Sequence, residues 1–295
     1  MNILILGAGG MLGHRLWLAA RERHAITAVV RGADTALADR LAVPRAEVLT
    51  GVEAGRFESV VRAVAKARPD VVVNCVGVVK QRPEAKDPVE SLTINALFPH
   101  RLADLCRAAG ARLVHLGTDC VFSGRRGGYR EDDPPDAGDL YGQTKALGEV
   151  TGPGALTLRT SIIGRELAHG LGLVEWFLAR PGPNVPGYTR AIFSGVTTLE
   201  LARVILLVVE RFPALTGLYP VAAAPISKAD LLGLLNTAFE CGWTIRPVDE
   251  PSVDRSLDGT RFRDATGWVP PSWPDMITEL ARDARVAYGA LTHGS

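Results

Sequence analysis

Cysteine is scarce in this sequence, and the few that occur lie far apart. Cys75, Cys106, Cys120 and Cys241 are the only four among 295 residues, and no two form a C-x-x-C pair. Zinc sites and redox dithiols usually rest on such close pairs, and disulfide-stabilised domains carry far more cysteine. We therefore expect reduced thiols in a cytoplasmic protein, with no metal site and no disulfide framework.

An excess of charge and a long apolar run are also missing. The formal net charge is +1, which makes the chain a poor match for nucleic acid or an anionic membrane. No apolar run reaches the ~20 residues that a membrane span needs. The N-terminus lacks the basic segment with which a signal peptide begins. What remains is a globular protein, and 47% hydrophobic residues are ample for a large core.

The start of the chain has the pattern of a dinucleotide-binding turn. Residues 3–6 are a short apolar run, typical of a strand buried on both faces. Three glycines follow at a spacing of three residues, before a helical pattern. A strand, a glycine turn and a helix N-terminus together present backbone N–H groups to a pyrophosphate. We predict cofactor contacts from Gly7, Gly9, Gly10, Met11, Leu12 and Gly13.

A basic residue, Arg31, follows the second predicted strand at residues 25–30. An acidic residue in this place would hold the ribose 2′-OH of NAD, whereas an arginine suits the 2′-phosphate of NADP. We therefore expect NADP(H) in preference to NAD(H), with Arg15 as a second contact. The alternative for Arg31 is a solvated arginine at the end of a strand.

Strand and helix patterns alternate up to about residue 160. We predict strands over residues 46–49, 70–77, 112–116 and 155–159, and helices over 57–67 and 89–109. Such alternation predicts an α/β fold with a doubly wound, Rossmann-type parallel sheet over residues 1–160. Small residues at the end of the fourth strand, Cys75, Val76 and Gly77, would let a cofactor approach. Asn95 is unfavourable inside a helix unless its amide is bonded, so we expect it either to brace this strand near the cofactor or to be exposed.

The composition changes after Thr160, where glycine and proline become frequent. Helical patterns return at residues 196–210, 228–239 and 275–288. We predict a smaller substrate-binding lobe over residues 161–295, with chain segments that cross between the two parts.

A tyrosine and a lysine four residues apart, Tyr141 and Lys145, lie in a predicted helix. Residues at this spacing share one helix face. A nearby ammonium group lowers the pKa of a phenol, ordinarily about 10, and makes it a proton donor for a carbonyl oxygen that receives hydride on its carbon. Thr118, after the fifth predicted strand, could bond the same oxygen. The spacing alone is common, but its context favours a ketone reductase.

Several blocks of sequence support this interpretation together. They are Gly7-x-x-Gly10-x-x-Gly13, Thr118-Asp119-x-Val121-Phe122-x-Gly124, Tyr141-Gly142-x-Thr144-Lys145-x-x-Gly148-Glu149, Leu158-Arg159-Thr160 and Ser256-Leu257-Asp258. Combined, they resemble the extended short-chain dehydrogenase/reductases, and within them the dTDP-4-dehydrorhamnose reductase group. The resemblance implies NADPH-dependent reduction of the 4-keto group of a nucleotide-activated 6-deoxy sugar, in deoxysugar and polysaccharide precursor biosynthesis.

The same resemblance implies roles for three residues. Tyr141 would donate the proton, and Lys145 would lower the pKa of this phenol and hold the nicotinamide ribose. Thr118 would bind the substrate carbonyl or the sugar. Gly117, Cys120 and Ser123 replace residues usual in the group, and residues 50–52 lack the acidic residue usual after the third strand. Because these departures lie near substrate or adenine, we expect the chemistry to be retained and leave the sugar and the base unassigned.

The second lobe is expected to contact the nucleotide sugar. A guanidinium fork matches phosphate oxygens, which favours two arginines for the diphosphate, and two aromatic residues could stack on the base or line the sugar pocket. The predicted substrate contacts are Thr118, Asp119, Val121, Phe122, Trp176, Arg190, Phe193 and Arg255. In the second lobe the alternatives are a solvated arginine and a core aromatic. A homodimer is a further expectation.

Two other functions stay open. An epimerase or dehydratase of the same superfamily would hold NAD tightly and recycle it, although Arg31 and the pair Asp119-Cys120 do not favour this. A non-catalytic NADP-binding regulatory subunit, similar to the β subunit of methionine adenosyltransferase, is the other. The set of Thr118, Tyr141 and Lys145 favours catalysis.

Overall fold

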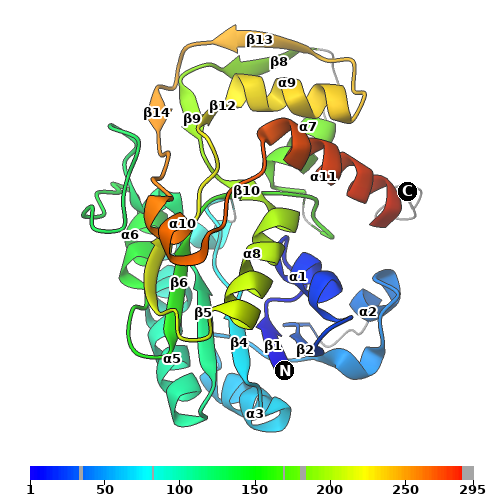
Figure 1. The fold of residues 1–295 in the computed structure, drawn as a ribbon, viewed down its shortest axis with the longest axis vertical. Helices are drawn as coiled ribbons and strands as arrows, with labels where there is room; N and C mark the ends of the chain where they lie inside the picture. Colours follow the sequence, from blue (N-terminus) through cyan, green and yellow to red (C-terminus); the bar gives the residue numbers. More distant parts are fainter. Residues whose placement is uncertain (33–35, 82, 169, 180–183, 288–295) are drawn as a thin grey trace.

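A seven-stranded sheet forms the centre of the computed structural model, which describes residues 1–32, 36–81, 83–168, 170–179 and 184–287 (Figure 1). Its order is β11-β6-β5-β4-β1-β2-β3, and every neighbouring pair is parallel. The strands are β1 (Asn2–Leu6), β2 (Ala25–Val29), β3 (Val48–Leu49), β4 (Val71–Asn74), β5 (Arg112–Leu116), β6 (Ala155–Arg159) and β11 (Gly217–Pro220). The predicted doubly wound α/β fold is confirmed.

Helices cover both faces of the sheet because successive strand side chains point in opposite directions. Ile3 and Ile5 of β1 belong to one apolar cluster, which includes residues of α1 (Gly13–Ala20) and α8 (Thr198–Arg211). Leu4 and Leu6 belong to a second cluster with α3 (Phe57–Ala67) and α5 (Phe98–Ala108). Both faces are thus covered, and the carboxyl ends of the strands are the edge at which ligands bind in such sheets.

The elements differ from the predicted ones where the chain approaches this edge. The helix predicted over residues 89–109 consists of α4 (Pro88–Ser91), the π-helical segment η3 (Leu92–Leu97) and α5. The third strand is reduced to β3, after the short helix η1 (Arg45–Glu47). The fourth strand, predicted to reach residue 77, ends at Asn74, where the Asn74 side chain accepts the N–H of Val76.

The chain beyond residue 160 returns to the main sheet. Helix α8 packs against α1, and β11 pairs with β6 so that Leu218 lies beside Thr157. Arg112 ties the start of β5 to this segment through bonds of 2.7 Å to the carbonyls of Val208 and Leu215. The chain returns because, without β11, the outer edge of β6 would have unpaired backbone N–H and C=O groups, which β11 satisfies. A boundary at residue 160 therefore does not follow the sheet.

The substrate lobe lies beyond the carboxyl ends of the main strands (Figure 1). It is built on small sheets that the sequence did not predict, with order β12-β9-β14, β13-β8 and β10-β7. Their strands are β7 (Ile162–Ile163), β8 (Asn184–Tyr188), β9 (Ala191–Phe193), β10 (Val196–Thr197), β12 (Ile226–Ser227), β13 (Thr244–Val248) and β14 (Val253–Asp254). Helices α7 (Leu173–Leu178), α9 (Lys228–Ala238), α10 (Thr260–Thr266) and α11 (Trp273–Ala287) accompany them.

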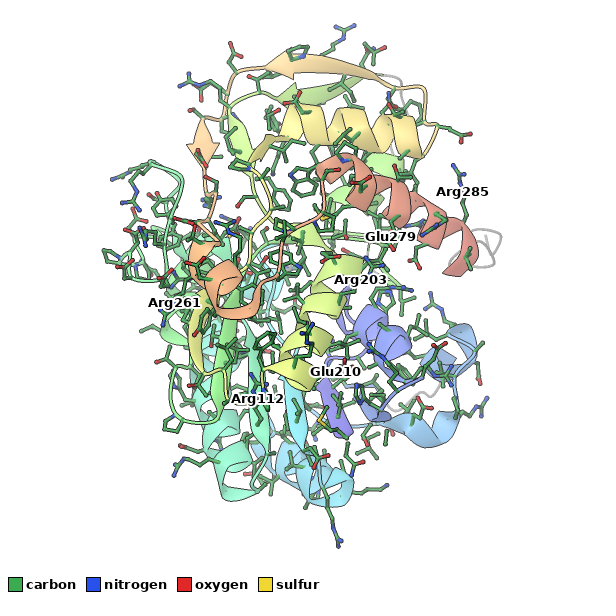
Figure 2. All side chains as sticks on the ribbon, viewed as in Figure 1. Arg112, Arg203, Glu210, Arg261, Glu279 and Arg285 are labelled. Carbon is green, nitrogen blue, oxygen red and sulfur yellow. The ribbon has the colours of Figure 1, made fainter. Side chains whose placement is uncertain are left out.

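The lobe is fastened to the sheet domain by ion pairs at α11. Arg203 of α8 pairs with Glu279 of α11 (Figure 2), and Arg15 of α1 pairs with Asp283 at 2.9 Å. The helix predicted over residues 275–288 begins two residues earlier, at Trp273. Tyr288, its predicted end, lies outside the described residues. The remaining elements are α2 (Ala36–Arg40), η2 (Pro83–Lys86), η4 (Asp119–Val121) and α6 (Leu140–Leu147). No helix in the described ranges is long and apolar enough to cross a membrane.

Candidate active site

The glycine turn after β1 is closely packed. Gly7 has a φ of +78°, which a residue with a side chain rarely adopts, and its carbonyl accepts the N–H of Gly10 at 2.9 Å. A Cβ atom on Gly13 would lie 2.2 Å from the Gly7 oxygen. The first turn of α1 has no side-chain cap, which leaves its backbone N–H groups without a side-chain acceptor there. The turn therefore has the close backbone approach that a pyrophosphate needs.

A cavity of about 240 Å³ adjoins this turn and brings four of the predicted cofactor residues together. Gly7, Arg31, Val76 and Gly77 line it. Its other lining residues include apolar side chains from β1, β2, η3 and α5 and three acids: Leu6, Val29, Val52, Glu53, Ala54, Gly55, Val60, Val78, Glu84, Glu90, Ile94 and Phe98. Arg31 is the cation of this lining. A mostly apolar slot beside a pyrophosphate turn fits an adenosine moiety.

Sequence reasoning missed the acidic side of the cavity. Glu53 lines the cavity, one residue beyond residues 50–52, where the sequence has no acidic residue. Its carboxylate is held by two bonds from Arg56, of 2.9 and 2.8 Å. Arg15, expected beside Arg31, is instead paired with Asp283. The pair with Asp283 leaves Arg31 as the arginine that lines the cavity.

Tyr141 and Thr118 meet at the carboxyl edge of the sheet. Burial raises the pKa of the Tyr141 phenol well above its usual value, and the Cys120 thiol and Asp119 carboxyl add to this, whereas a hydrogen bond with the Thr118 side chain acts in the opposite direction. The predicted fall of this pKa is therefore wrong for the protein alone. A phenol in this environment stays protonated at neutral pH, which is the form that a proton donor needs.

Lys145 lies one turn further along α6, as predicted, and is buried. Its ammonium group donates a bond of 2.8 Å to the carbonyl oxygen of Leu116. Burial lowers the pKa of Lys145 to about 8, although Glu149 favours the charged form. The bond therefore fixes the ammonium group at the carboxyl end of β5, the strand that leads to Thr118.

Two glycines let α6 approach its neighbours closely. A Cβ atom on Gly142 would lie 2.3 Å from the carbonyl oxygen of Cys120 in η4, and one on Gly148 would lie 1.8 Å from that of Asn95 in η3. Asp139 caps the helix through the N–H of Gly142. The glycines of the Tyr141 motif therefore have a packing role, because they hold the catalytic helix between η4 and η3.

Asn95 braces the chain after β4, which is one of the two alternatives that we predicted for it; the other was an exposed side chain. Its side chain accepts the N–H of Val78 at 2.9 Å and donates to the carbonyl of the same residue at 3.1 Å. A third contact, of 3.5 Å, reaches the hydroxyl of Thr144. The loop after β4 is thus joined to α6 through one buried amide in a π-helical turn, a type of turn frequent at functional sites.

Several motif residues are structural rather than exposed to a ligand. Val121 and Phe122 are fully buried in a cluster with Tyr129, Ala222 and Leu257. The Phe122 ring stacks on Tyr129 at 4.1 Å. Behind it, Glu149 and Arg159 form a buried ion pair with bonds of 2.8 and 2.7 Å. The predicted substrate contacts at Val121 and Phe122 are therefore wrong, since these side chains have no free surface.

The two aromatic residues predicted to contact the substrate, Trp176 and Phe193, both pack against the hydrophobic core. Phe193 is buried against Trp273, with ring centroids 5.3 Å apart, and belongs to the core. Trp176 on α7 is partly buried against the same core. Phe193 has too little exposed surface to stack on a base. The core-aromatic alternative holds for Phe193.

The two predicted arginines also differ. Arg255 follows β14 and donates a bond of 2.8 Å from its Nε to the carbonyl of Phe122, beside η4. It acts electrostatically on both Asp119 and Cys120. Arg190 lies exposed on the turn between β8 and β9. The fold therefore brings Thr118, Asp119 and Arg255 together among the predicted substrate residues.

Lys228, the first residue of α9, was not predicted for the site. It opposes, with Arg255, the rise that burial imposes on the pKa of Asp119. Its position near Asp119 depends on the pairing of β12 with β9, for which the sequence carries no signal. Cys120 is no activated thiolate, because burial raises its pKa to about 12.

Comparison with known proteins identifies relatives of the chain. The family model described as the RmlD substrate binding domain matches residues 1–180. A dTDP-4-dehydrorhamnose reductase from Streptomyces griseus is 38% identical over 148 residues, which are 50% of this chain and 43% of that protein. The chain spans about half the length of the curated relatives that it matches.

Solved structures agree on the fold. The hypothetical dTDP-4-dehydrorhamnose reductase from Sulfolobus tokodaii has a TM-score of 0.76 at 25% identity, over 92% of this chain and 98% of its own. The dTDP-4-dehydrorhamnose reductase from Bacillus anthracis, in complex with NADP, has a TM-score of 0.77 at 21% identity, over 95% of this chain and 98% of its own.

Proposed function

Since the chain belongs to the family of the RmlD substrate binding domain, we propose that it is an NADPH-dependent reductase of the 4-keto group of a nucleotide-activated 6-deoxy sugar. The observation that carries the proposal is that the side chains of Tyr141 and Thr118 are close enough to interact, at the carboxyl edge of a parallel sheet whose first turn is rich in glycine. Sugar-nucleotide 4-ketoreductases among the relatives support the substrate class.

The residues present fit a bound NADP. The turn from Gly7 to Gly13 would hold the pyrophosphate, and the cavity beside it would take the adenosine, with Arg31 next to the 2′-phosphate. The relative from Bacillus anthracis was solved with NADP. Bound NADPH supplies the hydride for the carbonyl carbon.

The side chains then provide the proton and the orientation. Thr118 and Tyr141 both offer hydroxyl groups to the carbonyl oxygen, which fixes the ketone and stabilises the charge that develops on it. Tyr141 gives up its proton as the oxygen becomes an alkoxide, a much stronger base than a phenolate. Lys145, one turn further along α6 and bonded to Leu116, would supply a positive charge on the same helix face when it is protonated. The apolar packing around η4 keeps this group of residues in place.

The test is oxidation of NADPH by purified protein with dTDP- or UDP-linked 4-keto-6-deoxyhexose. We expect turnover that depends on the keto sugar. Tightly bound NAD in the purified protein, with no net NADPH consumption, would instead support an epimerase or dehydratase. Co-purification with a partner enzyme and no turnover on any keto sugar would support the regulatory subunit.

A further inference from the structure

Two cations of the substrate lobe lie on either side of β9. In the sheet β12-β9-β14, Ile192 of β9 pairs with Ser227 on one side and with Asp254 on the other. Lys228 and Arg255 are the next residues along the two flanking strands. Because β12 runs antiparallel and β14 parallel to β9, Lys228 follows toward Ala191 and Arg255 toward Phe193. One small sheet thus sets the separation of both charges.

Neither cation forms an ion pair among the described residues, although both act on the carboxyl of Asp119. Arg255 is held near η4 by two bonds. The backbone N–H of Asp254 donates to the carbonyl of Gly124 at 2.7 Å, and the Nε of Arg255 donates to the carbonyl of Phe122. Over the described ranges, neither the Nη groups of Arg255 nor the ammonium of Lys228 has a hydrogen bond or an ion pair. Both side chains are half-buried. Because a partly desolvated cation is unfavourable unless it is paired, the arrangement favours an anionic ligand.

The two cations border the reacting groups. Coulombic effects fall with distance, and both Lys228 and Arg255 act on the carboxyl of Asp119. Asp119 is bonded to Thr118, whose side chain also meets Tyr141. Both cations therefore lie near Asp119, and Asp119 contacts one of the hydroxyls that would bind a carbonyl. Arg190 is exposed on the turn before β9.

We propose that Lys228 and Arg255 together form the subsite for the diphosphate of a nucleotide sugar, with Lys228 as a further substrate-binding residue. The fork of Arg255 would bind one phosphate through two N–H groups, and the compact charge of Lys228 would bind the other. A diphosphate held there leaves the sugar to reach Thr118 and Tyr141. The subsite rests on the proposed reductase function for its substrate class.

The experiment measures calorimetric binding of dTDP and UDP to the full chain saturated with NADP, so that the cofactor site is closed to the probes. Lys228→Gln and Arg255→Gln are compared with Arg190→Gln and with Arg62→Gln, a charge loss on the exposed face of α3. We expect the first two to raise the Kd of both diphosphates about tenfold or more, because each removes a charge-assisted bond. Affinities for thymidine, uridine and NADP should stay within about twofold.

An unchanged diphosphate Kd in Lys228→Gln would overturn the proposal, as would a loss confined to Arg190→Gln or a wild type that binds neither probe. Lys228 carries no bond within the described structure, so its variant tests the subsite without disturbing the fold, and the NADP affinity of Arg255→Gln reports on folding there. Diphosphate binding that falls in both variants, with no turnover on any keto sugar, would keep the subsite and reject the reductase. Turnover on a keto sugar, with diphosphate affinity unchanged in both variants, would keep the reductase and reject the subsite.

Discussion

The ammonium nitrogen of Lys145 lies 2.8 Å from the carbonyl oxygen of Leu116, and this bond joins the catalytic helix α6 to the end of β5. The group is charged and buried, and burial lowers its pKa from 10.5 to about 8. The unfolded chain therefore binds a proton that the folded chain has lost between pH 8 and 10.5. The folded state is penalised below this window, and the penalty disappears as the pH rises through it.

Lys145→Met removes the buried charge together with its bond to Leu116, so we expect the pH trend to report on the charge: the free energy of unfolding of wild type should rise relative to that of the variant between pH 8 and 10.5. Urea denaturation across this pH range measures both quantities. Lys66→Met, on the exposed side of α3, is the matched control and should show no such trend. A difference between variant and wild type that stays constant from pH 8 to 10.5 would contradict the interpretation.

Tyr141→Phe should lower kcat by a factor of about 10² to 10⁴, because it removes the proton donor while leaving the ring in place. The Kd of NADPH should change little. Gln143→Ala, on the exposed side of the same helix, is the control and should keep its activity. Turnover within a few-fold of wild type in Tyr141→Phe would mean that another group supplies the proton.

Because burial raises the pKa of Tyr141, the phenol should stay protonated far above neutral pH. We therefore expect no loss of kcat on the alkaline side that follows the ordinary titration of a tyrosine near pH 10. A pH profile of kcat measures this. A profile that falls at the ordinary tyrosine value would show that bound NADPH and substrate restore the usual acidity of the phenol.

Gly13→Ala should lower the free energy of unfolding by about 1–3 kcal/mol, since the new methyl group would meet the Gly7 oxygen at 2.2 Å. Gly9→Ala adds the same methyl group in the same turn, where the nearest atom is 3.7 Å away, and should change stability by about 0.5 kcal/mol or less. Thermal or urea unfolding of the pair measures the difference. Equal effects would show that the turn can relax.

Asn95→Ala should lower the free energy of unfolding by about 2–4 kcal/mol, because it leaves the buried N–H and carbonyl of Val78 without their partner. It should also lower kcat, since Thr144 of the catalytic helix loses its link to the loop after β4. Thr93→Ala, in the same π-helical turn, is the control for the loss of a polar side chain. Equal losses in both variants would show that the turn, rather than the amide bridge, matters.

Arg31→Glu should lower the ratio of kcat/KM for NADPH to that for NADH about tenfold or more, because a carboxylate repels the 2′-phosphate that the guanidinium would bind. Initial rates with the two cofactors measure the ratio. Arg15→Gln, which affects an arginine already paired with Asp283, should leave it unchanged. A ratio unaffected by Arg31→Glu would assign the arginine to the solvated surface.

The predictions from sequence were reliable where a local pattern decides the structure. Residues 112–116 and 155–159 form strands as predicted, since a short apolar run suits a strand buried on both faces. The predictions failed where contacts with distant segments of the chain decide the structure. The helix predicted over residues 89–109 is interrupted by a π-helical turn, because Asn95 must reach Val78. The strands β8, β9 and β12 to β14 are paired by distant partners and leave little periodic signal in so few residues.

By itself, the sequence determined the parallel sheet, the glycine turn and the placing of Tyr141 and Lys145 on one helix face, because each depends on residues near one another in the chain. Only the tertiary structure decided which residues are free to meet a ligand. Val121, Phe122 and Phe193 are core residues, whereas Lys228 and Arg255 lie near the Asp119 carboxyl and form no ion pair among the described residues. Burial and charge pairing depend on segments that meet from far apart in the chain, and the pKa values of Tyr141 and Lys145 follow from that same packing.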